Sequence, residues 1–191
     1  MPYTVPEARV REVPFTNNLL VNPGFEIWQR GTTFSNKTSG FYGADEWFCS
    51  VGTGNQVDFV RSGVPLYGDY AALFRYDTDG GLANASISQG IENYKSLEGL
   101  WVTFSAWVYQ DTANAVKLVI NDYDGSYEQA LSDSSEVVGS WVQITVSKQI
   151  RSGLLAGVGN IPHSFGISVA FAMQARASLP ETRIDGAVLA I

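Results

Sequence analysis

The sequence predicts an all-β protein built as an antiparallel sandwich. Apolar and polar residues alternate with a period of two in about ten short segments, as they do when successive side chains of a strand point to opposite faces. Clusters of Gly, Asp, Asn and Ser separate these segments and are typical of turns. No stretch of a dozen residues carries a helical apolar stripe, and only 92–99 is expected to form a single helical turn. Short strands with polar turns favour a β-sandwich or jelly roll, as one domain over residues 17–191.

The N-terminal segment, residues 1–16, is predicted to be an extended arm. It holds three of the seven prolines and shows no sustained period. Proline cannot donate a hydrogen bond to a strand ladder and restricts the residue before it. We therefore expect an extended segment and not a folded element over residues 1–16.

The strands are predicted from the alternation itself. In 101–109 the residues Val102, Phe104, Ala106 and Val108 fall on one face, and Trp101, Trp107 and Tyr109 fall on the other. The segments 140–148 and 165–173 repeat the pattern with branched and aromatic residues. Further strands are expected at 44–51, 56–62, 70–76, 85–91, 116–120 and 182–191.

Charge and cysteine content exclude several classes of function. The net charge is -7, from 12 Lys and Arg against 19 Asp and Glu, which argues against binding to nucleic acid or to a membrane surface. No apolar run is long enough for a membrane helix, and residues 1–16 lack the apolar core of a secretory signal. The single cysteine, Cys49, allows no internal disulfide and is expected to be a buried, inert thiol.

Three motifs in order carry a resemblance to known proteins. The stretch 18–31, NLLVNPGFEIWQRG, resembles the first strand of jelly-roll carbohydrate-binding modules of families four, nine and twenty-two. Its Phe-x-x-Trp-Gln-Arg-Gly portion, followed by Ala-Asp-x-Trp at 44–47, is similar to a phage variant found in tail fibres and other virion appendages. The stretch 88–109 fits the same variant. The likeness covers residues 17–110 well and returns weakly at the last strand.

The resemblance suggests a role for Glu26, an acid within an apolar stretch. In the carbohydrate-binding relatives, an acid of the first strand and one of the last help to hold a structural calcium; here these are Glu26 and Asp185, with backbone carbonyls completing the shell. Relatives often have two acids where this chain has Asp185 and Gly186. The alternative is that Glu26 pairs with Arg30 or Arg183, or caps backbone amides.

Exposed aromatic residues are the candidates for sugar binding, because sugar rings stack on Trp and Tyr while amides read their hydroxyl groups. The alternative is that most tryptophans fill the core or a subunit interface, as we expect for Trp28 and Trp47. The glycan-binding candidates are Trp107, Tyr109, Tyr123, Tyr127, Trp141 and Gln143.

Catalysis finds little support in the sequence, and the chain is predicted not to be an enzyme. His163 is the only histidine, and Ser164 beside it does not make a catalytic triad. The two Asp-x-Asp-Gly stretches, at 77–80 and 122–125, lack the later ligands of a calcium loop and are expected to be hairpin turns.

The resemblance implies a virion protein that is made in the host cytoplasm. It implies a domain of a tail or head fibre, forming a homotrimer, that adheres to host cell-surface polysaccharide without covalent chemistry. Its partners would be a host glycan and other virion proteins, the latter through residues 1–16. The alternative is a purely structural decoration or adaptor protein with the same fold and no glycan binding.

Overall fold

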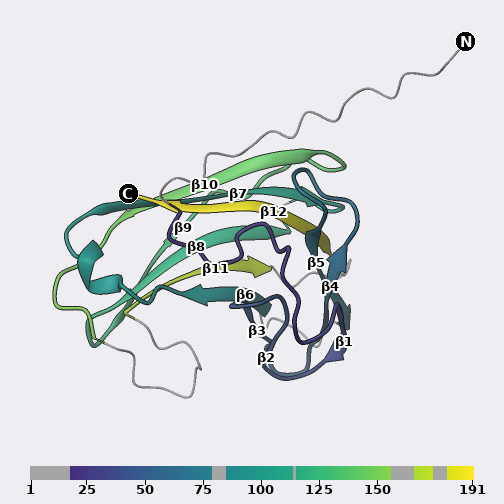
Figure 1. Cartoon of the computed structure of the whole chain (residues 1–191), viewed down its shortest axis with the longest axis horizontal. Helices are drawn as coiled ribbons and strands as arrows, with labels where there is room; N and C mark the ends of the chain where they lie inside the picture. The colour runs from purple at the N-terminus through teal and green to yellow at the C-terminus, as the bar shows by residue number, and fades with distance from the viewer. Residues whose placement is uncertain (1–17, 79–84, 114, 156–165, 174–179) are drawn as a thin grey trace, which may run out of the picture.

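The computed structural model describes residues 18–78, 85–113, 115–155, 166–173 and 180–191. Two six-stranded antiparallel sheets pack face to face, and a short 3-10 turn, η1 (Tyr94–Leu97), is the one helical element among these residues (Figure 1). The all-β sandwich predicted from the sequence is therefore confirmed, as is the turn near 92–99. The arm predicted at 1–16, together with His163 and Ser164, lies outside the described residues.

We call the two layers sheet A and sheet B. From edge to edge, sheet A consists of β1 (Thr33–Lys37), β4 (Gln56–Ser62), β5 (Ala71–Thr78), β12 (Glu181–Ala190), β7 (Trp101–Gln110) and β10 (Trp141–Gln149). Sheet B consists of β2 (Phe41–Tyr42), β3 (Phe48–Ser50), β6 (Ala85–Gly90), β11 (Ile167–Met173), β8 (Val116–Tyr123) and β9 (Tyr127–Leu131). Every neighbouring pair is antiparallel, as expected for hairpins and Greek-key connections.

The core lies between the sheets and is built from the apolar half of each alternating strand. The side chains of Val102, Phe104, Ala106 and Val108 are fully buried, which confirms the face predicted for β7. Aromatic rings from distant segments meet at its centre, with Phe25 4.9 Å from Trp47 between ring centroids. The predicted core residues Trp28 and Trp47 are both buried, and so is Cys49, whose thiol pKa is raised by burial.

The stretch 18–31 does not form the regular first strand that its resemblance predicts. Asn22 and Phe25 have φ values of 49° and 56°, and left-handed residues interrupt a strand ladder. The stretch still lies against the last strand: the N–H of Leu19 donates to the carbonyl of Leu189 (3.0 Å). Gln89 of β6 holds its other side, because its side-chain amide bonds both the N–H and the carbonyl of Val21.

Three strands were not predicted from the sequence, β1, β2 and β9. β2 has two residues, and β9 is mostly exposed, so neither shows an alternating pattern. The register of β1 shifts between Phe34 and Lys37, where Asn36 has a φ of 55°.

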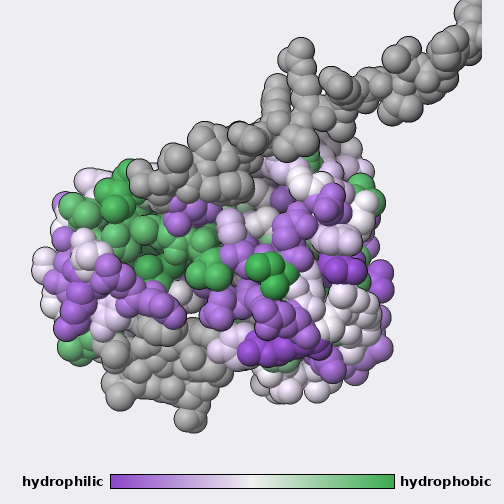
Figure 2. Space-filling view, viewed as in Figure 1, coloured by the Kyte–Doolittle hydropathy of each residue, from purple (hydrophilic) through white to green (hydrophobic). Residues whose placement is uncertain are grey.

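No helix in the described part of the chain is long and apolar enough to cross a membrane. Figure 2 shows apolar residues gathered at the left of the view, the side on which Figure 1 marks the C-terminus, and polar residues over most of the remaining surface.

Candidate functional site

The predicted acidic pair, Glu26 and Asp185, holds a single loop between β4 and β5. Asp185 is 1% exposed, and its Oδ2 accepts hydrogen bonds from the N–H groups of Leu66 (2.8 Å) and Tyr67 (2.7 Å). Glu26 is exposed, and its Oε1 accepts from the N–H groups of Asp69 (3.0 Å) and Tyr70 (3.2 Å). The pair thus fixes loop 66–70 through four backbone amides. Of the readings open for Glu26, the capping of backbone amides is confirmed.

The environment of Asp185 disfavours its ionised form. The pKa of Asp185 is raised to about 6, chiefly by burial and in smaller part by the nearby Glu26 carboxylate. The N–H groups of Tyr67, Leu66 and Gly186 act in the opposite direction by bonding the ionised carboxylate. Gly68 has a φ of +63°, and a Cβ there would meet Glu26 Oε1, so the loop needs glycine at this position.

Calcium at this pair stays a prediction. The donors that face the two carboxylates are backbone N–H groups, which occupy oxygen lone pairs that a cation would take. The described residues include no cluster of three or more His, Cys, Asp or Glu side chains suited to a metal. The two carboxylates therefore do not by themselves make a calcium site.

Four of the predicted glycan-binding residues lie together on the outer face of sheet A. In the register of β7 and β10, Trp141 is opposite Tyr109 and Gln143 is opposite Trp107. The rings already contact other side chains: Trp141 packs on Tyr109 with 5.9 Å between centroids, and Tyr67 of loop 66–70 packs on Trp107 with 6.3 Å. Together with Arg183, these residues form what we call the aromatic platform (Tyr67, Trp107, Tyr109, Trp141, Gln143 and Arg183).

Charged residues extend the platform across sheet A. The guanidinium of Arg183 lies over the Tyr109 ring, 5.2 Å from its centroid, and pairs with Glu181 at 2.7 Å. Arg75 bonds the buried Asp58 at 2.8 Å. Acidic and basic side chains therefore alternate across sheet A, and each forms an ion pair with a neighbour.

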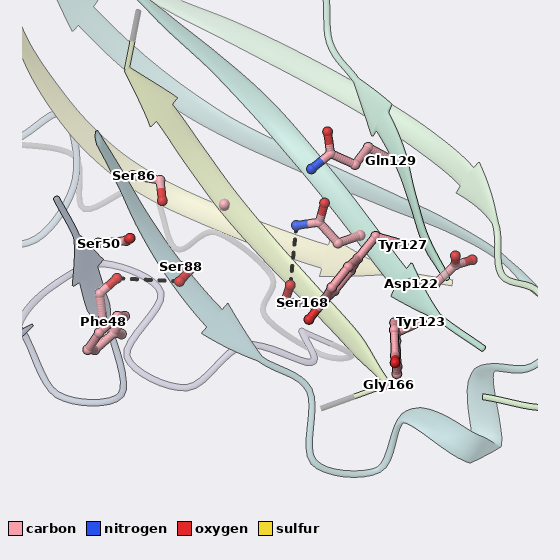
Figure 3. Close-up of a pocket in the computed structure, with 12 residues that line it drawn as sticks. Phe48, Ser50, Ser86, Ser88, Asp122, Tyr123, Tyr127, Gln129, Gly166 and Ser168 are labelled. Atoms are coloured by element: carbon pink, nitrogen blue, oxygen red, sulfur yellow. Dashed lines mark hydrogen bonds between the residues drawn. The ribbon is translucent and has the colours of Figure 1, made fainter. Parts of the chain in front are cut away.

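The other two predicted residues, Tyr123 and Tyr127, border a groove on the outer face of sheet B (Figure 3). The groove has a cavity volume of about 260 Å³ and crosses β3, β6, β11, β8 and β9. Small side chains on the two central strands leave room above the sheet, and larger rings stand at the sides. The lining residues are Phe48, Ser50, Ser86, Ser88, Asn121, Asp122, Tyr123, Tyr127, Gln129, Gly166, Ser168 and Ala170.

The polar groups of the groove are mostly neutral amides and hydroxyls. Asn121 donates through Nδ2 to the Ser168 hydroxyl (3.3 Å), and its buried Oδ1 has no partner among the described residues. Gln129 lies opposite Asn121 on β9. Tyr123 and Tyr127 pack side by side, 4.7 Å between ring centroids. Amide and hydroxyl groups beside two tyrosine rings are suited to a ligand with both hydroxyl groups and apolar faces.

A buried ion network fixes the hairpin that carries the two tyrosines. Asp122, 1% exposed, lies 2.6 Å from Arg151 and 3.3 Å from Lys148. Lys148 is also buried and pairs with Glu128 at 2.7 Å, while Arg151 reaches Asp124 in the turn at 2.8 Å. The turn itself is the Asp-Gly hairpin turn expected at 122–125, with Gly125 at a φ of 116°.

These hydrogen bonds and charges also shift pKa values. The Asp122 carboxylate, which accepts a hydrogen bond from the guanidinium, raises the pKa of Arg151 above its ordinary value. Hydrogen bonds from the Ser126 N–H and hydroxyl lower the pKa of Asp124. Both groups are charged in the network at neutral pH. The one carboxylate among the described lining residues, Asp122, is paired with the two cations Lys148 and Arg151.

The six predicted residues are therefore divided between opposite faces of the sandwich. The aromatic platform on sheet A contains four of them, and the groove on sheet B contains two. Asn121, Gln129 and the serines of β6 and β11 were not predicted from the sequence. The serines occupy outward positions of the alternating segments 85–91 and 165–173, but no local pattern shows that these two strands lie side by side.

Comparisons with known proteins identify the fold. No protein-family description and no curated protein matches the sequence. Among solved structures, a cyclase from Fischerella sp. TAU matches with a TM-score of 0.57 and 11% identity, over 89% of this chain and 94% of that one. The CBM22-1 xylan-binding domain from Paenibacillus barcinonensis Xyn10C matches with a TM-score of 0.52 and 11% identity, over 82% of this chain and 90% of that one.

Part of a phage protein has the same fold as well. The enzymatically active domain of bacteriophage CBA120 tailspike protein 4 matches with a TM-score of 0.54 and 15% identity, over 90% of this chain. The match covers 21% of the tailspike structure, so this chain spans about a fifth of that protein's length. At these identities the comparisons show that the chain has the jelly-roll fold of carbohydrate-binding modules, as its sequence motifs predicted.

Proposed function

We propose that this chain is a non-catalytic glycan-binding domain of a phage virion appendage, which adheres to host cell-surface polysaccharide through the groove on sheet B. The groove itself carries the proposal. The fold shared with carbohydrate-binding modules and a tailspike domain supports it, and so do the three phage-like sequence motifs.

The chemistry of the groove matches a neutral sugar chain. Sugar rings present apolar C–H faces that stack on Tyr123 and Tyr127, and hydroxyl groups that bond amides such as Asn121 and Gln129. The described lining residues include no Lys, Arg, Glu or His, so none of them favours an acidic sugar by its charge.

The absence of catalysis is part of this proposal and rests on the state of the groove's carboxylate. Asp122 is buried and paired with both Lys148 and Arg151, so it is not available to transfer protons to a ligand. Glycoside hydrolysis uses two carboxyl groups across the sugar, and the part of the groove that the structure describes supplies one.

The aromatic platform is a second candidate for glycan binding, on the strength of Trp107, Tyr109, Trp141 and Gln143. Its rings contact one another, Tyr67 and Arg183, which leaves less of their surface for a sugar than the open groove offers. The structural alternative, a decoration or adaptor protein, would use such a platform for assembly. The homotrimer, attachment through residues 1–16 and location in the virion stay predictions of the resemblance.

Glycan binding can be tested by screening the purified protein on a glycan array and titrating the best neutral polysaccharide by calorimetry. We expect weak binding per site, with Tyr127→Ala and Tyr123→Ala each reducing affinity by about tenfold, or about 1.4 kcal/mol. Trp141→Ala on the aromatic platform is the matched control and should change affinity by less than about twofold. A blank array together with no binding to host cells would contradict the proposal. Loss of binding in Trp141→Ala alone would move the site to sheet A.

A further inference from the structure

The two sheets have four edge strands, and three of them carry features that hinder pairing with another chain. β2 is two residues long. β1 has a register shift beside Asn36 and ends in the charged Lys37. β9 is five residues long and carries the exposed Glu128. Short strands, irregularities and edge charges are the devices by which proteins prevent edge-to-edge association.

The fourth edge, β10, is neither short nor irregular, and it carries no charged side chain on its outer face. It pairs with β7 through nine consecutive residues without a register shift, from Trp141 to Gln149, and contains no proline. Its outer side chains are neutral and, except for the half-buried Trp141, exposed. Its one charged residue, Lys148, points inward and is paired with Asp122 and Glu128. No described group outside β7 bonds the backbone of 141–149. The outer residues are Trp141, Gln143, Thr145, Ser147 and Gln149.

We propose that β10 pairs antiparallel with β10 of a second copy of this chain, about a two-fold axis at Thr145. This register uses all nine residues of both strands, because it places Trp141 opposite Gln149 of the second copy and Thr145 opposite itself. At every position, a residue on the outer face of one copy lies opposite a residue on the outer face of the other. Ile144 meets Val146 of the second copy on the inner side, so the apolar layer continues from one sheet A into the next.

We assign the strand that pairs with β10 to a second copy of this chain because β10 is complementary to itself in this register. The chain as a whole has a net charge of -7, which would repel a copy at most surfaces. Along β10 no charged outer side chain faces its own equivalent, so this edge avoids the repulsion. The register also accounts for Trp101, which is 61% exposed and lies beside Gln149 in β7. The two-fold axis places Trp141 of the second copy opposite Gln149, on the same face of the sheet as Trp101.

The mass in solution tests the pairing. We expect sedimentation equilibrium at about 100 µM to give twice the 20.8 kDa of the chain, since this concentration exceeds the dissociation constant of a micromolar interface. Thr145→Lys and Thr145→Glu should each give monomers, because the two-fold places the introduced charge opposite itself. An equimolar mixture of these two variants should recover the dimer. Thr33→Lys makes the same change on β1, an edge that already carries features that hinder pairing, and this variant should have the same mass as the wild type.

Each other outcome overturns the inference. A monomeric or trimeric wild type excludes the two-fold pairing, and so does a Thr145→Lys variant that remains dimeric. Variants that are monomeric apart and in the mixture would exclude the register at Thr145. A thermal melt and circular dichroism of each variant verify that the sandwich is intact, which the exposed position of Thr145 leads us to expect. The experiment involves no glycan, so its result is independent of the proposed function.

Discussion

The outer faces of the two sheets use aromatic residues in opposite ways. On sheet A the rings of the aromatic platform lie on neighbours of similar size, and Arg183 covers Tyr109 at 5.2 Å. On sheet B, Tyr123 and Tyr127 stand beside strands that present serine and alanine, and a cavity of about 260 Å³ results. The number of aromatic residues does not decide which face can accept a ligand. The size of the side chains on the adjacent strands does.

The two faces also differ in the charges that support them. Asp122 below the groove is paired with Lys148, which is 6% exposed, whereas Asp58 on sheet A is paired with Arg75, whose side chain is 46% exposed. Breaking a buried pair leaves a charge without water, while an exposed partner is rehydrated. The groove is therefore expected to depend on its ion network more strongly than the platform depends on its own.

The largest expected effect comes from breaking these two networks in turn. Asp122→Ala should lower the free energy of unfolding by about 3–5 kcal/mol, because Lys148 and Arg151 lose their shared partner. Asp58→Ala should cost about 1–2 kcal/mol, mainly through the unpaired N–H of Asn36. Urea unfolding of both variants measures the difference. Equal losses would show that burial of the partner does not govern these networks.

A smaller effect is expected from pH, through Asp185 beneath the platform. Its folded pKa of about 6 lies above its ordinary value of 3.8, so the folded state binds the proton more tightly than the unfolded state. Stability from this group therefore rises as pH falls through 6, by about 1–2 kcal/mol between pH 7 and pH 5. Thermal unfolding in EDTA with and without Asp185→Asn isolates the contribution.

The same titration tests the calcium prediction, because a bound cation reverses the sign. Calcium held by Glu26 and Asp185 would lower the pKa of both carboxyl groups, and stability would then fall as the pH is lowered. A calcium-dependent rise in melting temperature that disappears in Glu26→Gln would support the metal. If added calcium leaves both the melting temperature and the pH slope unchanged, the prediction is wrong.

The smallest expected change in stability, with a clear change in binding, comes from filling the groove. Ser88→Leu adds a branched side chain to the central strand β6 and should reduce glycan affinity by at least about tenfold with little effect on unfolding. Ser105→Leu makes the same change on an outer position of β7 in sheet A and should leave binding unchanged. Calorimetric titration of both variants compares the faces directly. Equal losses would place the ligand elsewhere.

The sequence predicted most of the fold because burial follows local alternation. The inward row of β7 and the core residues Trp28 and Trp47 were identified from neighbours in the chain alone. The conformation of the stretch 18–31 was not predicted, because Asn22 and Phe25 adopt left-handed conformations that the pattern of apolar residues does not reveal. The segment is held instead by the side chain of Gln89, a contact across 68 residues of sequence.

The candidate site was predicted only in part, for a related reason. Tyr123 and Tyr127 were found because they flank an Asp-Gly turn, and turns lie at the surface. The groove beside them depends on β11 lying between β6 and β8, so that Ser88 and Ser168 reach one surface. Strand order across a sheet is a non-local property, and no periodicity within one segment contains it.

The bond between Gln89 and Val21 has a mechanical consequence. Gln89 belongs to β6, and the next outward residue before it, Ser88, lines the groove. Tension that enters the domain at Asn18 would be shared between β12, which bonds Asn18 and Leu19, and β6, which bonds Val21 through Gln89. The bond between Val21 and Gln89 thus links the stretch 18–31 to a strand that lines the groove.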